Sequence, residues 1–187
     1  MSDLPTAPTL ADQIVEIEKT IRDCGRRWPE QVAKGYMTEA VVESRLEILR
    51  RVHTQLMWLD ANPWALAMAA AMADAVGAGP AGLAGERAEI TAQTAENARR
   101  FPILIERGRL TVATAQRKQA AMAAVLHTVT WLARNTEWIR EEAAKRARDE
   151  REDLANHPAA RMVLDAFPGA TVRAASKIMW GPSDGGL

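Results

Sequence analysis

The sequence predicts an all-α protein built from two copies of one helical hairpin. Residues 12–59 align without a gap on residues 85–132 at a constant offset of 73, and eleven of the 48 paired positions are identical. Ordinary composition would give roughly three identities, so the alignment indicates an internal duplication. Apolar residues also recur at spacings of three and four, as in helices that bury one face. We therefore expect two antiparallel hairpins packed as a helical bundle.

The repeat boundaries divide the chain into four segments. They are a first helical hairpin (1–60), an Ala/Gly-rich helix and linker (61–85), a second helical hairpin (86–134), and a charged helix with a small helix-turn-strand tail (135–187).

The first arm of the first hairpin carries a regular apolar stripe. Its members are Leu10, Ile14, Ile17, Ile21, Cys24, Trp28 and Val32. Thr9 and Asp12 can form the capping box at its start. Pro29 lies within the stripe, and because proline lacks an amide donor we expect the helix to kink or break there. Gly35 then provides a left-handed cap at the end.

The returning arm begins at Thr38, whose hydroxyl can accept hydrogen bonds from free helix amides. Met37 and Val42 occupy the two positions of a hydrophobic staple. The returning stripe consists of Val42, Leu49, Val52, Leu56 and Leu59. A turn this short forces the two helices to lie antiparallel.

The second copy keeps this plan but has a more polar stripe. The equivalent positions are Leu83, Arg87, Ile90, Thr94, Asn97, Phe101 and Ile105. Such a hairpin would be poorly held by itself. We expect it to pack against the first hairpin, giving a four-helix arrangement, or against a second chain.

Between the copies, the apolar run Trp64–Val76 indicates a short helix. The glycines that follow it indicate a linker. Gly77, Gly79 and Gly82 satisfy the G-x-G-x-x-G pattern, but no strand precedes them, which favours a linker over a dinucleotide-binding loop.

After Leu132 the helix either continues or restarts at Asn135-Thr136. The mixed charges of residues 138–153 are typical of a solvated helix. Asn156-His157-Pro158 can open another short helix, which Pro168-Gly169 would stop. The pattern of Thr171–Ala174 predicts one short strand with no partner strand elsewhere in the sequence. Such a segment either remains a loop or pairs with a sheet on another molecule.

Composition restricts the classes of partner. The 24 basic and 24 acidic residues balance, so no overall charge attracts the chain to nucleic acid or anionic membrane. The most apolar run is too short to span a bilayer. A single cysteine and a start that does not resemble a signal peptide suit a reducing compartment, so we expect a cytoplasmic protein without a membrane partner.

Two family resemblances extend this interpretation. The run Arg26-Arg27-Trp28-Pro29, with Val32, Gly35 and Met37-Thr38, resembles an R-R-x-Y-P-x-x-V-x-x-G-x-M-T hairpin found in short uncharacterised phage and prophage proteins. That resemblance implies a phage origin and no particular activity. The chain differs from this family in having two copies and an added tail.

The second resemblance covers about fourteen residues of the tail. His157-Pro158 and the run from Val163 to Ala170 are similar to the C-terminus of the alphaproteobacterial clamp-loader tau subunit. That region contacts the replicative polymerase, so the resemblance implies DNA replication machinery as a partner. Ala159-Ala160 departs from the bulkier pair of that family.

No pattern predicts an enzyme, a metal site or a cofactor. His53, His127 and His157 lack metal-ligand spacing, and the two copies do not align His53 with His127. Cys24 lies on an apolar stripe, where we interpret it as a small buried hydrophobe. We expect no catalytic, cofactor-binding or metal-binding residue.

A protein-interaction role is the main expectation. Large aromatic residues outside the repeated core are typical of interfaces. The predicted partner-binding residues are Trp138, Phe167, Val172 and Trp180. The partner would be replication machinery, another host protein, or further copies of the chain in an oligomer.

The alternative is a nucleic-acid-binding accessory factor. Residues 86–132 contain seven basic and four acidic residues, whereas the first copy has eight of each. Basic residues cluster near the turn of the second hairpin and could contact phosphates. The residues assigned to this alternative are Arg99, Arg100, Arg107 and Arg109.

Overall fold

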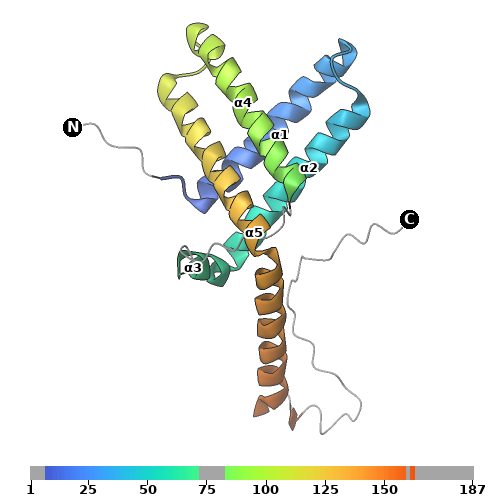
Figure 1. The fold of residues 1–187 in the computed structure, drawn as a ribbon, viewed down its shortest axis with the longest axis vertical. Coiled ribbons are helices and arrows are strands. Elements are labelled where there is room, and N and C mark those ends of the chain that lie inside the picture. Colours follow the sequence, from blue (N-terminus) through green and yellow to red (C-terminus); the bar gives the residue numbers. More distant parts are fainter. Residues whose placement is uncertain (1–6, 72–82, 159–160, 163–187) are drawn as a thin grey trace, which may run out of the picture. The chain divides into compact units, whose positions relative to one another are not determined.

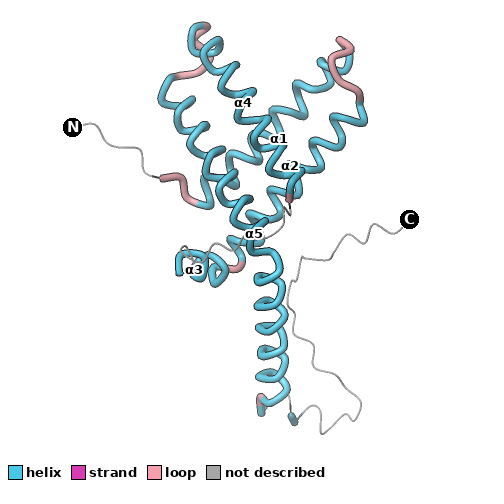
Figure 2. Tube along the Cα trace, in the orientation of Figure 1, coloured by secondary structure: helices cyan, strands magenta, loops and turns pink. Residues whose placement is uncertain are grey.

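The computed structural model describes residues 7–71, 83–158 and 161–162, and these are almost entirely helical (Figures 1 and 2). The helices are α1 (Leu10–Ala33), α2 (Glu39–Ala61), α3 (Pro63–Ala71), α4 (Ala84–Glu106) and α5 (Val112–Asn156). The described residues contain no strand. The predicted all-α fold is therefore confirmed, while the tail strand predicted at 171–174 lies outside the described residues.

The chain divides into two compact units, Met1–Asn135 and Thr136–Leu187. The first unit holds both hairpins, formed by α1 with α2 and by α4 with the start of α5 (Figure 1). The second unit contains the remainder of α5.

Helix α1 begins with the capping box expected from its sequence. The Thr9 hydroxyl accepts a hydrogen bond from the Asp12 amide (3.2 Å), and the Asp12 carboxylate accepts one from the Thr9 amide (2.9 Å). These contacts satisfy two backbone donors that would otherwise lack a helical partner.

Replacing Thr9 by alanine should lower the free energy of unfolding by about 1 kcal/mol, because the Asp12 amide loses its acceptor. Urea denaturation of the full chain measures this loss. Thr9→Ser, which keeps the hydroxyl, serves as the control and should remain close to the original stability. Equal losses in the two variants would contradict a role for the hydroxyl.

The expected break at Pro29 does not occur. Helix α1 is continuous to Ala33 with Pro29 inside it, and α4 likewise runs through Pro102. A proline removes one helical hydrogen bond, which can be tolerated where tertiary contacts hold the preceding turns of the helix. The neighbouring side chains of Cys24 and Trp28 are buried and supply such contacts.

The two hairpins turn in the same way. Gly35 and Gly108 both have a left-handed backbone, with φ of +73° and +65°. The amide of the next residue, Tyr36 or Arg109, donates to the carbonyl five residues earlier, at 2.9 and 2.8 Å. Both ends are Schellman caps, as the left-handed glycine cap in the sequence predicted.

The helix boundaries also repeat with the sequence offset. Helices α1 and α4 end 73 residues apart, and so do the starts of α2 and α5. The Thr38 hydroxyl accepts a hydrogen bond from the Val41 amide (3.3 Å), and Thr111 accepts one from the Thr114 amide (3.2 Å). The duplicated segments therefore adopt the same local structure.

One hydrophobic core joins the two hairpins. Its buried members are Ile14, Ile17, Cys24, Trp28, Leu49, Val52, Leu56, Ile90, Met122, Val125 and Val129. They come from α1, α2, α4 and the first part of α5, so the second hairpin is held by the first. This confirms the predicted four-helix arrangement.

The two returning helices differ at their ends. Asn62 and Asn135 occupy equivalent positions and both donate a side-chain hydrogen bond (2.8 Å) to the carbonyl of a tryptophan four residues earlier. Pro63 follows Asn62, whereas Thr136 follows Asn135. Because a proline after the C-cap does not continue the helix, α2 stops and α3 begins, while α5 continues to Asn156.

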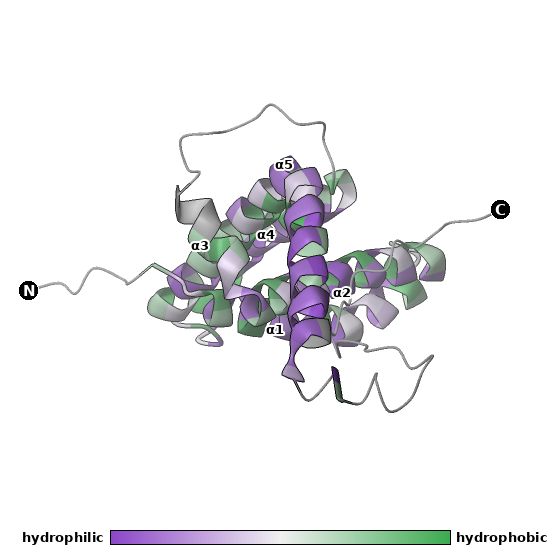
Figure 3. Cartoon of the chain, turned by 90° about the horizontal axis from the view of Figure 1, so that it is seen from below, coloured by the Kyte–Doolittle hydropathy of each residue, from purple (hydrophilic) through white to green (hydrophobic). Residues whose placement is uncertain are grey.

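The part of α5 in the second unit is strongly charged. Its exposed residues include Glu141, Lys145, Arg148, Asp149, Glu150, Arg151, Glu152 and Asp153, and Figure 3 shows this segment as mainly hydrophilic. The predicted solvated helix is therefore present. Among the described residues, no helix is both long and apolar enough to cross a membrane.

Candidate interaction surfaces

A row of polar residues on α4 faces the first hairpin. Glu86, Glu89, Gln93 and Glu96 follow one another at spacings of three and four, which places them on one side of the helix. Three of the four are buried, the exception being the half-buried Glu96. We call this row, with its partners on α1 and α2, the polar seam.

The strongest contact in the seam joins Arg45 of α2 to Glu89 of α4. The arginine donates through Nε and Nη2 to the two carboxylate oxygens, at 2.8 and 2.9 Å. The Gln93 amide donates to the same carboxylate at 2.8 Å. The guanidinium also lies 4.7 Å from the ring centre of Trp28, a cation–π arrangement. Glu89 is thus buried with a bidentate partner, the geometry that best compensates a buried charge.

Further along the seam, Arg27 donates to the Glu96 carboxylate at 2.6 Å. Cys24 lies between Arg27 and Gln93. Its sulfur is 3.7 Å from Arg27 Nη2 and 3.7 Å from Gln93 Oε1. Burial raises the pKa of the Cys24 thiol to about 11 despite the nearby arginine charge. The thiol is therefore protonated at neutral pH and is a poor nucleophile.

A second buried ion pair lies at positions equivalent to the Arg45–Glu89 pair, with the acidic residue on the first hairpin and the basic residue on the second. Glu16 of α1 accepts a hydrogen bond from Lys118 of α5 at 3.1 Å. Glu16 is equivalent to Glu89, and Lys118 to Arg45, at the repeat offset of 73. Each pair joins the first arm of one hairpin to the returning arm of the other. Such reciprocal contacts are typical of two units related by an approximate two-fold axis.

Glu16 should give stability a specific dependence on pH. Burial raises the pKa of its carboxyl above 4.5, although the charge of Lys118 lowers it in part. A group with a raised pKa in the folded state contributes most stability below its unfolded pKa, and this contribution is lost as pH rises through the folded pKa. Glu16→Gln should therefore show a smaller decline in unfolding free energy than the original chain between about pH 4 and pH 7.

Urea denaturation at several pH values measures this difference. Asp12→Asn is a control of opposite sign, because the hydrogen bonds from Thr9 lower the pKa of Asp12. The contribution of Asp12 to the free energy of unfolding is lost as pH falls through the pKa that Asp12 has in the folded state. Parallel pH curves for Glu16→Gln and the original chain would contradict the expected role of Glu16.

The turn of each hairpin forms an exposed tip, which we call the first elbow (residues 30–39) and the second elbow (residues 103–112). Figure 1 shows the two elbows as separate tips of the first unit. On the second elbow Arg107 and Arg109 are exposed, together with the apolar side chains of Ile103 (48% exposed) and Val112 (55% exposed).

Of the four arginines assigned to nucleic acid, Arg99, Arg107 and Arg109 are exposed, whereas Arg100 is half-buried. Burial lowers the pKa of Arg100, and the charge of Arg27 acts in the same direction. The three exposed arginines are the more accessible to a phosphate backbone.

The first elbow has a different chemical character. Tyr36 is 74% exposed, and Glu30 and Glu39 are exposed as well. These three residues occupy the positions of Arg109, Ile103 and Val112 in the repeat. Each elbow also carries one exposed charge of the opposite sign, Lys34 on the first elbow and Glu106 on the second. The first elbow therefore has two acidic residues and one basic residue, and the second has two basic residues and one acidic residue.

No family model, curated protein or solved structure matches the chain. The assignment of a function therefore rests on the surfaces described above.

One of the four predicted partner-binding residues lies among the residues that the structure describes. Trp138 lies on α5 in the second unit and is half-buried. Phe167, Val172 and Trp180 lie outside the described residues. Sequence reasoning missed the exposed Ile103 and Val112, although each differs sharply from its repeat partner, Glu30 or Glu39.

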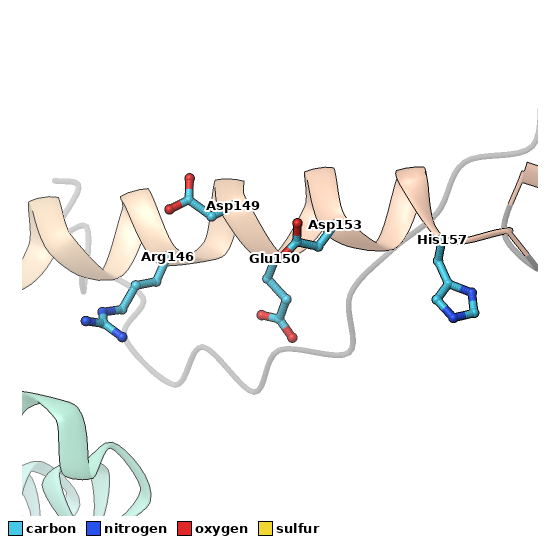
Figure 4. Close-up of a pocket in the computed structure, with 5 residues that line it drawn as sticks. All are labelled: Arg146, Asp149, Glu150, Asp153 and His157. Atoms are coloured by element: carbon cyan, nitrogen blue, oxygen red, sulfur yellow. The ribbon is translucent and has the colours of Figure 1, made fainter.

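A depression on the second unit is lined by residues of α5 and by His157, which follows it. The residues are Arg146, Asp149, Glu150, Asp153 and His157. Figure 4 shows them spread along the helix, with Asp149 directed away from Arg146 and Glu150. The part of the chain that the structure describes contains no group of three or more histidine, cysteine or acidic residues placed to hold a metal ion.

The described histidines lie in separate environments. His53 lies 3.2 Å from the Glu18 carboxylate on the neighbouring helix, and His127 is exposed on α5. The contact between His53 and Glu18 links α2 to α1.

Proposed function

We propose that this chain is a non-enzymatic, phage-type helical protein that acts in the cytoplasm by binding other proteins. The partner is replication machinery, another host protein, or further copies of the chain. The observation that supports this most is the second elbow, where the exposed Ile103 and Val112 stand beside Arg107 and Arg109.

The composition of this elbow fits a protein-binding surface. Interfaces are enriched in arginine and in apolar side chains, and the apolar groups supply most of the free energy of association. Exposed apolar residues on a tip that is held by a Schellman cap bind without first having to be ordered, which reduces the entropic cost. The fused core behind the elbow provides that rigid support.

Affinity capture from host lysate tests this proposal. The test variant combines Ile103→Ser, Arg107→Ala, Arg109→Ala and Val112→Ser. The matched control changes the equivalent first-elbow residues, Glu30→Ser, Lys34→Ala, Tyr36→Ala and Glu39→Ser. Loss of a captured protein with the test variant alone supports binding through the second elbow. Capture that is unchanged by the test variant would contradict it.

A nucleic-acid-binding accessory factor is the second candidate, favoured by the exposure of Arg99, Arg107 and Arg109. Fluorescence anisotropy with duplex DNA and with RNA over a range of salt concentrations tests it. Phosphate contacts would make the affinity fall steeply with salt, by a slope of about 0.9 per contact on a logarithmic scale. Replacing the three arginines by alanine should then abolish binding. Absence of binding at low salt would exclude this candidate.

A further inference from the structure

We propose that the chain binds further copies of itself head to tail, through the first elbow of one copy and the second elbow of the next. This inference rests on the proposed protein-binding function and names the partner of the second elbow. It follows from a comparison of equivalent positions on the two elbows.

The two elbows have matching backbones. Gly35 and Gly108 adopt the same left-handed conformation, and both turns close with the same pair of Schellman hydrogen bonds. Side chains at equivalent positions therefore project from the same places on each tip. Differences between the elbows are differences of chemistry on a common frame.

Three exposed positions carry complementary groups. The first elbow has Glu30, Tyr36 and Glu39 in the order acidic, aromatic, acidic. The equivalent residues of the second elbow are Ile103, Arg109 and Val112, in the order apolar, basic, apolar.

This exchange suits direct docking of one elbow on the other. Arg109 can pair with the carboxylate of Glu30 or of Glu39, and Arg–carboxylate contacts are strong and directional. The exposed ring of Tyr36 supplies apolar area for Ile103 and Val112, and its hydroxyl can remain in contact with water. The same contact therefore combines charge complementarity with burial of apolar surface.

Pairing of like elbows is disfavoured. Two first elbows would bring together two surfaces that each have one more acidic than basic residue, and two second elbows would bring together two surfaces that each have one more basic than acidic residue. Like charges placed opposite one another oppose association. The complementarity therefore selects a heterologous contact, which forms chains or rings when every copy carries one elbow of each kind.

The contact is small, because each elbow is the tip of a two-helix hairpin. Interfaces below the standard size are weak and transient, so we expect a dissociation constant of about 10⁻⁵ to 10⁻³ M. Self-association should accordingly appear only in concentrated solution and should weaken with salt.

Sedimentation velocity of the purified full-length chain at increasing concentration tests the proposal. The weight-average sedimentation coefficient should rise with concentration at low salt and fall when salt is added. Arg109→Glu should remove this rise by blocking the second elbow. Glu30→Arg with Glu39→Arg should remove it by blocking the first elbow. All three positions are exposed, so the variants should fold, and circular dichroism verifies this.

Mixing the two variants provides the decisive measurement. The Arg109→Glu chain keeps an intact first elbow, and the Glu30→Arg, Glu39→Arg chain keeps an intact second elbow. An equimolar mixture should therefore regain self-association, because the two intact elbows match and the two charge-reversed elbows are complementary to each other as well. Association that persists in either variant alone, or a mixture that stays monomeric, would overturn the head-to-tail contact.

The outcome separates this inference from the proposed function. Sedimentation uses this chain alone, whereas lysate capture asks whether the second elbow binds another protein. A monomeric original chain that still captures a lysate protein through the second elbow would overturn self-association and leave the proposed function standing. A chain that self-associates but captures nothing would restrict the function to assembly.

Discussion

Replacing Arg45 by methionine is expected to lower the free energy of unfolding by about 3–5 kcal/mol, the range for removing one partner of a buried ion pair. Glu89 is only 7% exposed. Without Arg45 its carboxylate would keep the hydrogen bond from the Gln93 side-chain amide and lose both hydrogen bonds from the guanidinium. The variant also loses the cation–π contact with Trp28. A buried charge without compensation is the main source of the loss.

Urea denaturation of the full chain measures this effect, and the repeat supplies a matched control. Lys118 is the equivalent of Arg45, but it donates one hydrogen bond to Glu16 instead of two. Lys118→Met should therefore cost less than Arg45→Met. In the double variant Arg45→Met, Glu89→Leu, both charges are gone, and stability should recover most of the way to the original value. A double variant as unstable as Arg45→Met would contradict the assignment to an unpaired charge.

Replacing Trp28 by alanine is expected to cost about 3–5 kcal/mol, as for other large-to-small substitutions of buried aromatic residues. Trp28 is 2% exposed, belongs to the common core and packs under the Arg45 guanidinium. Its removal leaves a cavity that the surrounding helices can fill only in part. The same substitution also removes the aromatic face that Arg45 covers.

Denaturation midpoints of two variants test this prediction. Trp28→Phe is the natural control, because phenylalanine occupies the equivalent position 101 of the second hairpin. It should cost roughly 1 kcal/mol, since it keeps most of the apolar volume. A loss for Trp28→Phe as large as for Trp28→Ala would show that the indole, and not the volume, is what the core requires.

The sequence predicts the backbone well where the signals are local. Thr9 and Thr38 cap helices, Gly35 takes a left-handed conformation, and the duplicated segments fold alike. Such features depend on one or two neighbouring residues, so their chemistry can be interpreted without knowledge of packing. Of the kink or break expected at Pro29, the break does not occur, and the buried Cys24 and Trp28 hold the preceding turns of the helix in place.

The polar seam was not predicted from the sequence. The polar positions of the second hairpin suggested a weak core, but the decisive row is offset from that stripe and consists of Glu86, Glu89, Gln93 and Glu96. Acidic residues at helical spacing usually mark a solvated face. They become buried only when arginines from the other hairpin cover them. The periodicity of one helix contains no information on which residues of another helix pack against it.

The candidate surface was predicted in part. Arg107 and Arg109 are exposed on the second elbow, whereas Arg100 is half-buried. Ile103 and Val112 were overlooked because apolar residues near a helix end are ordinarily attributed to the core. Comparison with Glu30 and Glu39 in the first copy would have identified them, since equivalent exposed positions tolerate both kinds of residue.

The reciprocal ion pairs also bear on how such a chain can change by mutation. In a symmetric homodimer, one substitution alters both copies of a contact at once. Here Glu16–Lys118 and Glu89–Arg45 are encoded separately, so one contact can acquire a bidentate arginine while the other keeps a lysine. Duplication within one chain thus allows natural selection to modify each half of a symmetric arrangement independently, and the two elbows can diverge in the same way without loss of the fold.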